Sequence, residues 1–275
     1  MREQVPNLAG TSRIYAVFGD PVEQVQTPTL INPLFARHGE DIYAVPFHVT
    51  FRTFDATWSV FAAMSNVAGI GVTVPHKVAG ARLCTTLTQA AAEVGAVNSI
   101  QRRADGTMHG ALFDGLGFVR GLGAHRKRLK DAAVLLVGAG GAGRAIAHAL
   151  IEEGIDRLSV LDVNTAARRM TMDMVNLIAG RQLARPGTRL DGHSVLINAS
   201  PVGLKASQPF PVDLSALRPE ILVADIAALS RETELLAKAR ALGCATSDGK
   251  DMLKAQIALI AGFAAGLPAG TPLGG

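Results

Sequence analysis

The chain has 275 residues, 48% of them hydrophobic and 18% charged, and its formal net charge is +4. This composition is typical of a globular protein with room for two moderate domains, and it excludes a disordered chain. The small net charge argues against binding to nucleic acid, and no apolar run approaches the roughly 18 residues that a membrane span requires. Cys84 and Cys244 lie far apart without metal-ligand spacing, so we predict no metal site and no disulfide framework. We expect a soluble, cytoplasmic protein without a signal peptide, a nucleic-acid partner or a membrane anchor.

Strand-like and helix-like segments alternate along the first part of the chain. Short buried strands are predicted at Ile14–Phe18, Ile42–Phe47 and Gly69–Val74. Helical patterns lie between them at Pro28–Arg37 and Thr53–Met64. This alternation predicts βαβ units and a parallel sheet.

A hairpin and a helix are expected next. The strand-like segments Val97–Gln101 and Thr107–Gly110 flank Ala104-Asp105-Gly106, whose Asp-Gly pair is typical of a hairpin turn. A helix is predicted over Asp114–Gly123. The basic run that follows it, residues 125–130, is interpreted as a solvated linker and not as a nucleic-acid patch.

The most informative segment is Val134–Leu150, an apolar strand followed by a glycine-rich turn and a helical pattern. Gly138, Gly140 and Gly143 have separate roles in a dinucleotide-binding turn: a tight turn, a close approach to the pyrophosphate, and close packing of helix on strand. The N-terminus of the helix then faces the anion. The segment therefore predicts a dinucleotide site.

A carboxylate follows this turn at the expected distance. The next apolar strand, Leu158–Leu161, ends at Asp162, close to the roughly 20-residue spacing of the dinucleotide-binding pattern. A carboxylate there accepts hydrogen bonds from the adenosine ribose and repels a 2′-phosphate, which favours NAD over NADP. The remaining predicted elements are strands at Val195–Asn198 and Leu222–Asp225 and helices at Glu232–Leu242 and Met252–Ala265.

The residue content of these segments resembles the shikimate/quinate dehydrogenase family. The matching motifs occur in the family's order along nearly the whole chain. They are Tyr15–Pro21, Val72–Lys77, Gly95–Ser99, Asp114-Gly115, Gly138–Gly143, Asn198–Gly203 and Asp248–Gln256.

The resemblance implies an α/β protein with two domains. Residues 1–113 and 249–275 would form a discontinuous substrate-binding catalytic domain, because the C-terminal helix returns to the first domain. Residues 114–248 would form a Rossmann-type dinucleotide-binding domain. The implied enzyme is an NAD-dependent dehydrogenase of a shikimate- or quinate-like hydroxy acid, working in either direction as a monomer or homodimer.

The proton chemistry of this reaction points to two residues. When a nicotinamide takes a hydride from a secondary alcohol, a side chain must take the hydroxyl proton. Lys77 follows an apolar strand and Pro75, which is expected to place its amine at the mouth of a cleft, and Asp114 is the candidate partner. The resemblance assigns the same roles: Lys77 accepts and donates the proton, and Asp114 orients it and contacts the substrate hydroxyl. His76 is interpreted as structural.

The substrate-facing positions depart from the family pattern. The family's Ser-x-Ser-Pro loop, which holds a carboxylate, is Val25-Gln26-Thr27-Pro28 here, and its Asn-Thr-Asp is Leu112-Phe113-Asp114. A tyrosine of the family is replaced by Ala228. The polar substrate contacts that remain are Thr27, Thr73, Asn98 and Gln256. We therefore expect the reaction type to be kept and the substrate to be less hydroxylated than shikimate, or differently substituted.

The cofactor positions favour NAD. Relatives that use NADP have Asn-Arg-Thr where this chain has Asp162-Val163-Asn164, and Arg168 and Arg169 lie further along the next helix. An acid therefore replaces the residues that would hold a 2′-phosphate. The cofactor contacts that the resemblance implies are Gly138, Ala139, Gly140, Gly141, Ala142, Asp162, Ser200, Ile226 and Gly249.

Two alternatives stay open. One is an NAD-binding regulatory or sensing protein of the same fold that has lost turnover, although a sensor has no need of the retained Lys77 and Asp114. The other is a folate-type dehydrogenase with a similar two-domain structure, which is supported only by the glycine-rich turn and a lysine.

Overall fold

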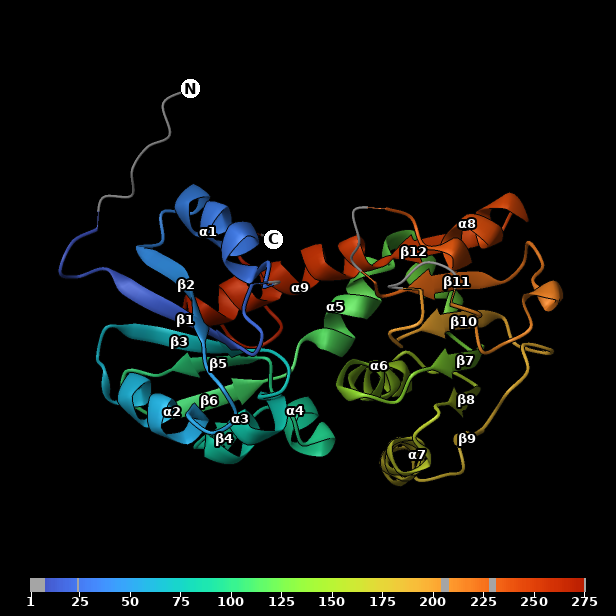
Figure 1. The fold of residues 1–275 in the computed structure, drawn as a ribbon, viewed down its shortest axis with the longest axis horizontal. Coiled ribbons are helices and arrows are strands. Elements are labelled where there is room, and N and C mark those ends of the chain that lie inside the picture. Colours follow the sequence, from blue (N-terminus) through green and yellow to red (C-terminus); the bar gives the residue numbers. More distant parts are fainter. Residues whose placement is uncertain (1–7, 24, 204–207, 228–230, 275) are drawn as a thin grey trace. The chain divides into compact units, whose positions relative to one another are not determined.

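The computed structural model describes residues 8–23, 25–203, 208–227 and 231–274, and these form two compact units (Figure 1). The first unit is Met1–Leu112 with Ile257–Gly275, and the second is Phe113–Gln256. The C-terminal part of the chain therefore returns to the first unit, as the resemblance implied. The sequence placed the boundaries one residue later at the first crossing and eight residues earlier at the second. Helix α9 (Gly249–Ala264) spans this second boundary.

The first unit contains a mixed sheet with the strand order β2-β1-β3-β5-β6-β4. The strands are β1 (Arg13–Gly19), β2 (Ile42–His48), β3 (Val67–Val72), β4 (Thr86–Leu87), β5 (Ser99–Arg102) and β6 (Met108–Ala111). The helices are α1 (Thr27–Arg37), α2 (Phe54–Ala63), α3 (Lys77–Leu83) and α4 (Gln89–Val94). Strand β1 pairs in parallel with β2 and β3, and β5 and β6 form the predicted antiparallel hairpin.

Aromatic packing fixes the carboxyl end of β1 in this unit. Phe18 is fully buried and makes edge-to-face contacts with Phe47, Phe54 and Phe61, with ring centroids 6.2, 6.3 and 5.1 Å away. Such contacts add to the burial of apolar area. They hold the end of β1 against β2 and α2, and this is the edge of the sheet at which Lys77 is predicted to act.

The second unit contains a parallel sheet with the strand order β12-β11-β10-β7-β8-β9. The strands are β7 (Ala133–Val137), β8 (Arg157–Leu161), β9 (Ala184–Pro186), β10 (Val195–Asn198), β11 (Leu222–Asp225) and β12 (Ala245–Asp248). The helices are α5 (Asp114–Gly121), α6 (Gly141–Glu152), α7 (Thr165–Ala179), α8 (Glu234–Ala241) and the first part of α9.

Helices cover both faces of this parallel sheet. Val134 and Leu136 of β7 pack in one buried cluster with residues of α5, α6 and α7. Leu135 and Val137, which point to the other face, pack in a second cluster with residues of α8. A parallel sheet buried on both faces is the doubly wound architecture of dinucleotide-binding domains, as predicted.

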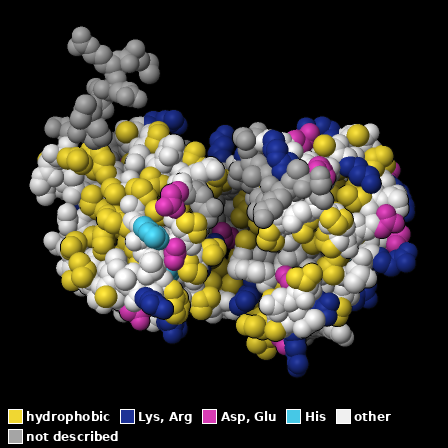
Figure 2. Space-filling view, viewed as in Figure 1, with side chains coloured by type: hydrophobic (Ala, Val, Ile, Leu, Met, Phe, Trp, Pro, Cys, Tyr) yellow, Lys and Arg dark blue, Asp and Glu magenta, His cyan; other side chains and the backbone are white. Residues whose placement is uncertain are grey.

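The basic run after α5 is tied into the second unit. It forms a 3-10 helix, Gly123–Arg128, in which Arg126 donates two hydrogen bonds of 2.8 Å to the carboxylate of Glu153. Figure 2 shows Lys and Arg side chains spread over the face in view, with Asp and Glu among them. Among the residues that the structure describes, every helix is too short or too polar to cross a bilayer.

Several short elements were not predicted from the sequence. Helices α3 and α4 have 7 and 6 residues, and β4 and β9 have 2 and 3. Such segments are too short to show a period of 3.6 or 2. Strand β3 was predicted to reach Val74 and ends at Val72.

Candidate dinucleotide and proton-transfer site

The glycine-rich turn between β7 and α6 is tightly packed at its ends and open in its middle. Gly138 has φ 103°, and a Cβ built on it would lie 2.5 Å from the carbonyl oxygen of Ala199. A Cβ on Gly143 would collide with the carbonyl oxygen of Gly138. A Cβ on Gly140 or Gly141 would have no heavy atom within 4 Å. The turn therefore needs two of its glycines for its own backbone, and it leaves open space at the N-terminus of α6, where anions bind.

Asp162 follows β8 and is bonded to this turn. Its Oδ2 accepts a hydrogen bond of 2.6 Å from the Ala139 N–H, and its Oδ1 accepts one of 2.7 Å from the Asn164 N–H. Asn164 in turn caps α7 through its side chain. A carboxylate has about four acceptor positions, so two remain for hydroxyl groups of a ligand.

Val163, the residue after Asp162, provides no cationic side chain for a phosphate. The Val163 side chain is 99% exposed and carries no charge. On α7, Arg169 lies 3.5 Å from the Asp173 carboxylate. Asp162 therefore presents a carboxylate beside the glycine-rich turn, and Val163 adds no cation to it.

The other predicted cofactor positions, Ser200, Ile226 and Gly249, follow the carboxyl ends of β10, β11 and β12. The Ala199 N–H donates to Val137 O at 2.7 Å, and a Cβ on Gly138 would lie 2.7 Å from the Ser200 nitrogen. A Cβ on Gly249 would collide with the carbonyl oxygen of Ile226. The structure therefore brings Ser200 beside the glycine-rich turn and Ile226 beside Gly249.

Asp114 is the first residue of α5 and is 6% exposed. Gln256 of α9 donates a hydrogen bond of 2.8 Å from Nε2 to Asp114 Oδ1. This contact depends on glycine, because a Cβ on Gly117 would lie 2.8 Å from the Gln256 Cβ. Gln256, predicted as a substrate ligand, thus holds the carboxylate of Asp114 in a fixed orientation in this structure.

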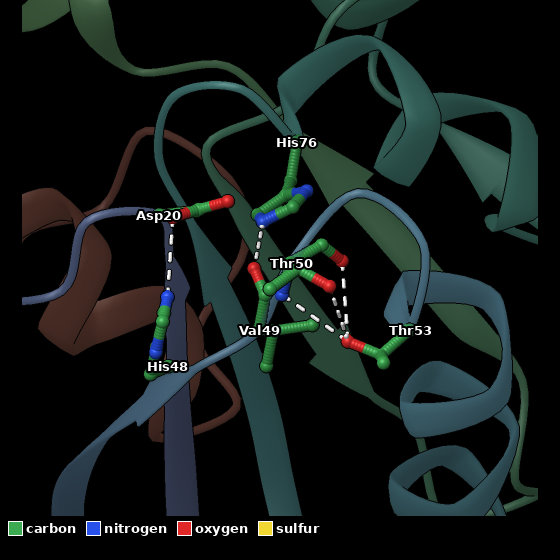
Figure 3. A network of polar contacts seen from close by, with 6 residues as sticks. All are labelled: Asp20, His48, Val49, Thr50, Thr53 and His76. Carbon is green, nitrogen blue, oxygen red and sulfur yellow. Dashed lines mark hydrogen bonds and ion pairs between the residues drawn. The ribbon is translucent and has the colours of Figure 1, made fainter.

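Lys77 begins α3 and its side chain is half-buried. The preceding residue, His76, is fully buried and stacks on Phe54 with ring centroids 4.6 Å apart. Its Nε2 donates to the Val49 carbonyl oxygen at 2.5 Å (Figure 3). This packing is that of a structural residue, and it fixes the start of the helix that carries Lys77.

Three of the predicted substrate contacts lie at the same end of the first sheet. A Cβ on Gly19 would lie 2.9 Å from Thr73 Cγ2 and 3.3 Å from Val25 Cγ2, so these two side chains meet over Gly19. Asn98 is 6% exposed and joins β3 to β6 through its backbone, and Thr27 begins α1. Ala228 lies outside the described residues.

Sequence reasoning missed a polar pair beside these residues. Asp20 follows β1, and its Oδ1 lies 3.1 Å from Nε2 of His48 at the end of β2 (Figure 3). Both residues stand at the ends of strands that the predicted βαβ unit makes neighbours, so the strand pattern could have drawn attention to them. A second group that was missed is the register pair Asn198 and Asp225, at the ends of β10 and β11 in the second unit.

The chain is similar to known dehydrogenases and reductases in sequence and in fold. Residues 17–100 match the family model described as the shikimate dehydrogenase substrate binding domain. The shikimate dehydrogenase (NADP(+)) of Rhodospirillum rubrum is 35% identical over 254 residues, which are 90% of this chain and 89% of that protein. The quinate/shikimate dehydrogenase (NAD(+)) of Corynebacterium efficiens is 36% identical over 196 residues, 67% of each chain. The ligand-free 5-ketofructose reductase of Gluconobacter sp. strain CHM43 has a TM-score of 0.83 at 26% identity, covering 92% of this chain and 96% of that one.

Proposed function

The chain belongs to the shikimate dehydrogenase family, and we propose that it is an NAD-dependent dehydrogenase that interconverts a secondary alcohol of a shikimate- or quinate-like hydroxy acid and the matching ketone. The observation that carries the choice of cofactor is the carboxylate of Asp162, bonded to a glycine-rich turn whose Gly140 and Gly141 face open space. Such a turn receives a pyrophosphate at the N-terminus of α6. Binding of NAD by the purified protein, measured by calorimetry, tests the first step of the proposal.

The chemistry needs one proton transfer from the protein. The bound nicotinamide supplies a hydride acceptor or donor. In the oxidative direction Lys77 takes the hydroxyl proton of the substrate at its Nζ, and in the reductive direction it returns that proton to the carbonyl oxygen. Asp114 stabilises the protonated amine and orients it, and Gln256 keeps the Asp114 carboxylate in place through its 2.8 Å hydrogen bond.

The relatives do not decide between the cofactors, because the names of two similar proteins specify NADP(+) and NAD(+) respectively. The residues of this chain favour NAD. A 2′-phosphate would meet the Asp162 carboxylate, and Val163 offers no cation in compensation. The two free acceptor positions of Asp162 suit the ribose hydroxyls of NAD.

We expect kcat/KM with NAD to exceed that with NADP by at least about tenfold. The double variant Asp162→Asn with Val163→Arg should narrow or invert this preference, because it removes the charge and adds a guanidinium. Asparagine retains one acceptor for the amides of Ala139 and Asn164, which alanine would not. The measurement is the initial rate with each cofactor, with Asp162→Asn alone as the control for folding. A wild-type preference for NADP would refute the assignment.

The glycine-rich turn gives a test that separates binding from folding. Gly140→Ala adds a methyl group where the protein has space, so the fold should be retained. That methyl group would stand where the pyrophosphate approaches, and we expect the Kd for NAD to rise by about tenfold or more.

The matched control is Gly143→Ala, whose Cβ meets the backbone of Gly138. This substitution should lower the free energy of unfolding by about 1–3 kcal/mol, measured by urea denaturation in the absence of NAD. Equal affinity of Gly140→Ala and the wild type would show that the pyrophosphate does not lie over this turn.

A further inference from the structure

Asn198, the last residue of β10, determines the path of the loop that follows it. Its side chain is fully buried. Nδ2 donates to the Val202 carbonyl oxygen at 3.0 Å, and Oδ1 accepts hydrogen bonds from the Ser200 N–H at 3.2 Å and from the Ser200 hydroxyl at 2.6 Å. One side chain therefore shapes the segment Ala199–Val202, which we call the switch-point loop.

Asp225, at the same position on the neighbouring strand β11, supports Asn198. It is 2% exposed, and its carboxylate accepts hydrogen bonds from the Ala227 N–H at 3.1 Å and the Thr233 hydroxyl at 2.9 Å. Burial raises the pKa of Asp225, while hydrogen bonds from Ala227, Asn198 and Thr233 oppose that rise. Asn198 and Asp225 are register partners on the adjacent strands β10 and β11, and the Asp225 carboxylate is bonded to Thr233, which caps the start of α8.

The switch-point loop occupies a special position in the sheet. The chain runs outward from β7 through β8 to β9, and then from β10 through β11 to β12 on the other side of β7. In open α/β sheets, dinucleotides bind across the crevice at this reversal of strand order, with one half on each side. Asp162 and the glycine-rich turn lie on the β7–β8 side, and the switch-point loop lies on the β10 side, where Ala199 bonds to Val137.

We propose that Asn198 and Asp225 are a positioning pair that holds the switch-point loop in the conformation that receives the nicotinamide half of the dinucleotide. The inference rests on the proposed function, since it assumes that NAD binds at this crevice. Neither residue is assigned a contact with the reacting atoms. Their effect is exerted through Ser200 and the backbone of the switch-point loop, whereas the adenosine half is held independently by the Asp162 side of the sheet.

The test compares NAD with AMP, which carries only the adenosine half. In Asp225→Asn an amide NH₂ replaces one acceptor oxygen and faces the donor of Ala227 or Thr233. We expect the Kd for NAD, measured by calorimetry, to rise by about tenfold or more, while the Kd for AMP stays within about twofold. A role in folding alone would weaken both ligands equally.

The control is Ser159→Ala in β8 of the same sheet. Ser159 is 2% exposed and hydrogen-bonds to Nε2 of His193 at 2.9 Å, so this variant also removes a buried polar contact. It should leave the ratio of the NAD and AMP affinities unchanged.

If Asp225→Asn does not fold, a second pair of variants tests the positioning role of Asp225. Thr233→Val removes the hydroxyl that bonds to Asp225 and keeps the side-chain shape, whereas Thr233→Ser keeps the hydroxyl. We expect Thr233→Val to weaken NAD selectively and Thr233→Ser to bind like the wild type. NAD binding unchanged in Asp225→Asn and Thr233→Val, or AMP and NAD weakened in equal proportion, would overturn the positioning role. A wild-type protein that binds neither ligand would instead refute the proposed function itself, and this inference with it.

Discussion

Replacing Lys77 by alanine is expected to lower kcat by about 10²-fold or more while leaving the Kd for NAD within about twofold, as for the loss of a general base. Lys77 belongs to the first unit, and the predicted cofactor residues belong to the second, so the substitution does not touch the dinucleotide turn. Alanine also favours helix, so α3 should keep its start. Steady-state rates and calorimetry measure the two quantities.

Two further variants make this test specific to the amine. Lys77→Arg keeps the positive charge, but its guanidinium does not release a proton at neutral pH, so its activity should be as low as that of Lys77→Ala. Added small primary amines should restore part of the lost rate in Lys77→Ala. Lys250→Ala, an exposed lysine in the first turn of α9, is the control. Wild-type turnover in Lys77→Ala would remove Lys77 from the mechanism.

Shikimate is expected to be a poor substrate, with kcat/KM about a hundredfold below that of an enzyme with the full set of polar contacts. Val25, Leu112 and Phe113 stand where the family pattern has polar residues. Each unpaired substrate hydroxyl costs about 1–3 kcal/mol, and two losses of about 1.4 kcal/mol give a hundredfold effect.

The most accessible of these positions is Val25, whose methyl group meets Thr73 over Gly19. Val25→Ser should raise kcat/KM for shikimate by about tenfold, whereas Val25→Ala, which only removes volume, should not. Leu112 and Phe113 are 6% and 3% exposed, so Leu112→Asn and Phe113→Thr are added to Val25→Ser only once its fold is established. Efficient turnover of shikimate by the wild type would show that these positions do not face the substrate.

Much of the fold could be predicted because the long buried strands are continuous apolar runs between turn residues. Strands β10 and β11 begin and end at the predicted residues, Val195–Asn198 and Leu222–Asp225. The short helices α3 and α4 could not be predicted from periodicity, because they have 7 and 6 residues, and the start of α3 also depends on residues distant in sequence. His76, for example, is held by Val49 and Phe54.

Those parts of the candidate site that lie close together in sequence could be predicted. The parts that are brought together by the order of the strands or the packing of distant helices could not. The glycine-rich turn and Asp162 belong to one βαβ unit, so the sequence alone brings them together. The hydrogen bond between Gln256 and Asp114 depends on the packing of α9 on α5. These two helices are separated in sequence by most of the second unit. The Asn198–Asp225 pair depends on β10 and β11 being neighbours, which no local pattern states.

The proposed dehydrogenase activity is tested most directly by a screen in which shikimate, quinate, their deoxygenated analogues and other hydroxy acids are each offered to the protein with NAD. Formation of NADH is followed by its near-ultraviolet absorbance, and ketones are offered with NADH in the reverse direction. We expect at least one substrate that is turned over by the wild type and about 10²-fold more slowly by Lys77→Ala. Firm binding of NAD without turnover of any compound in either direction would contradict this expectation and would favour a dinucleotide sensor built on the same fold.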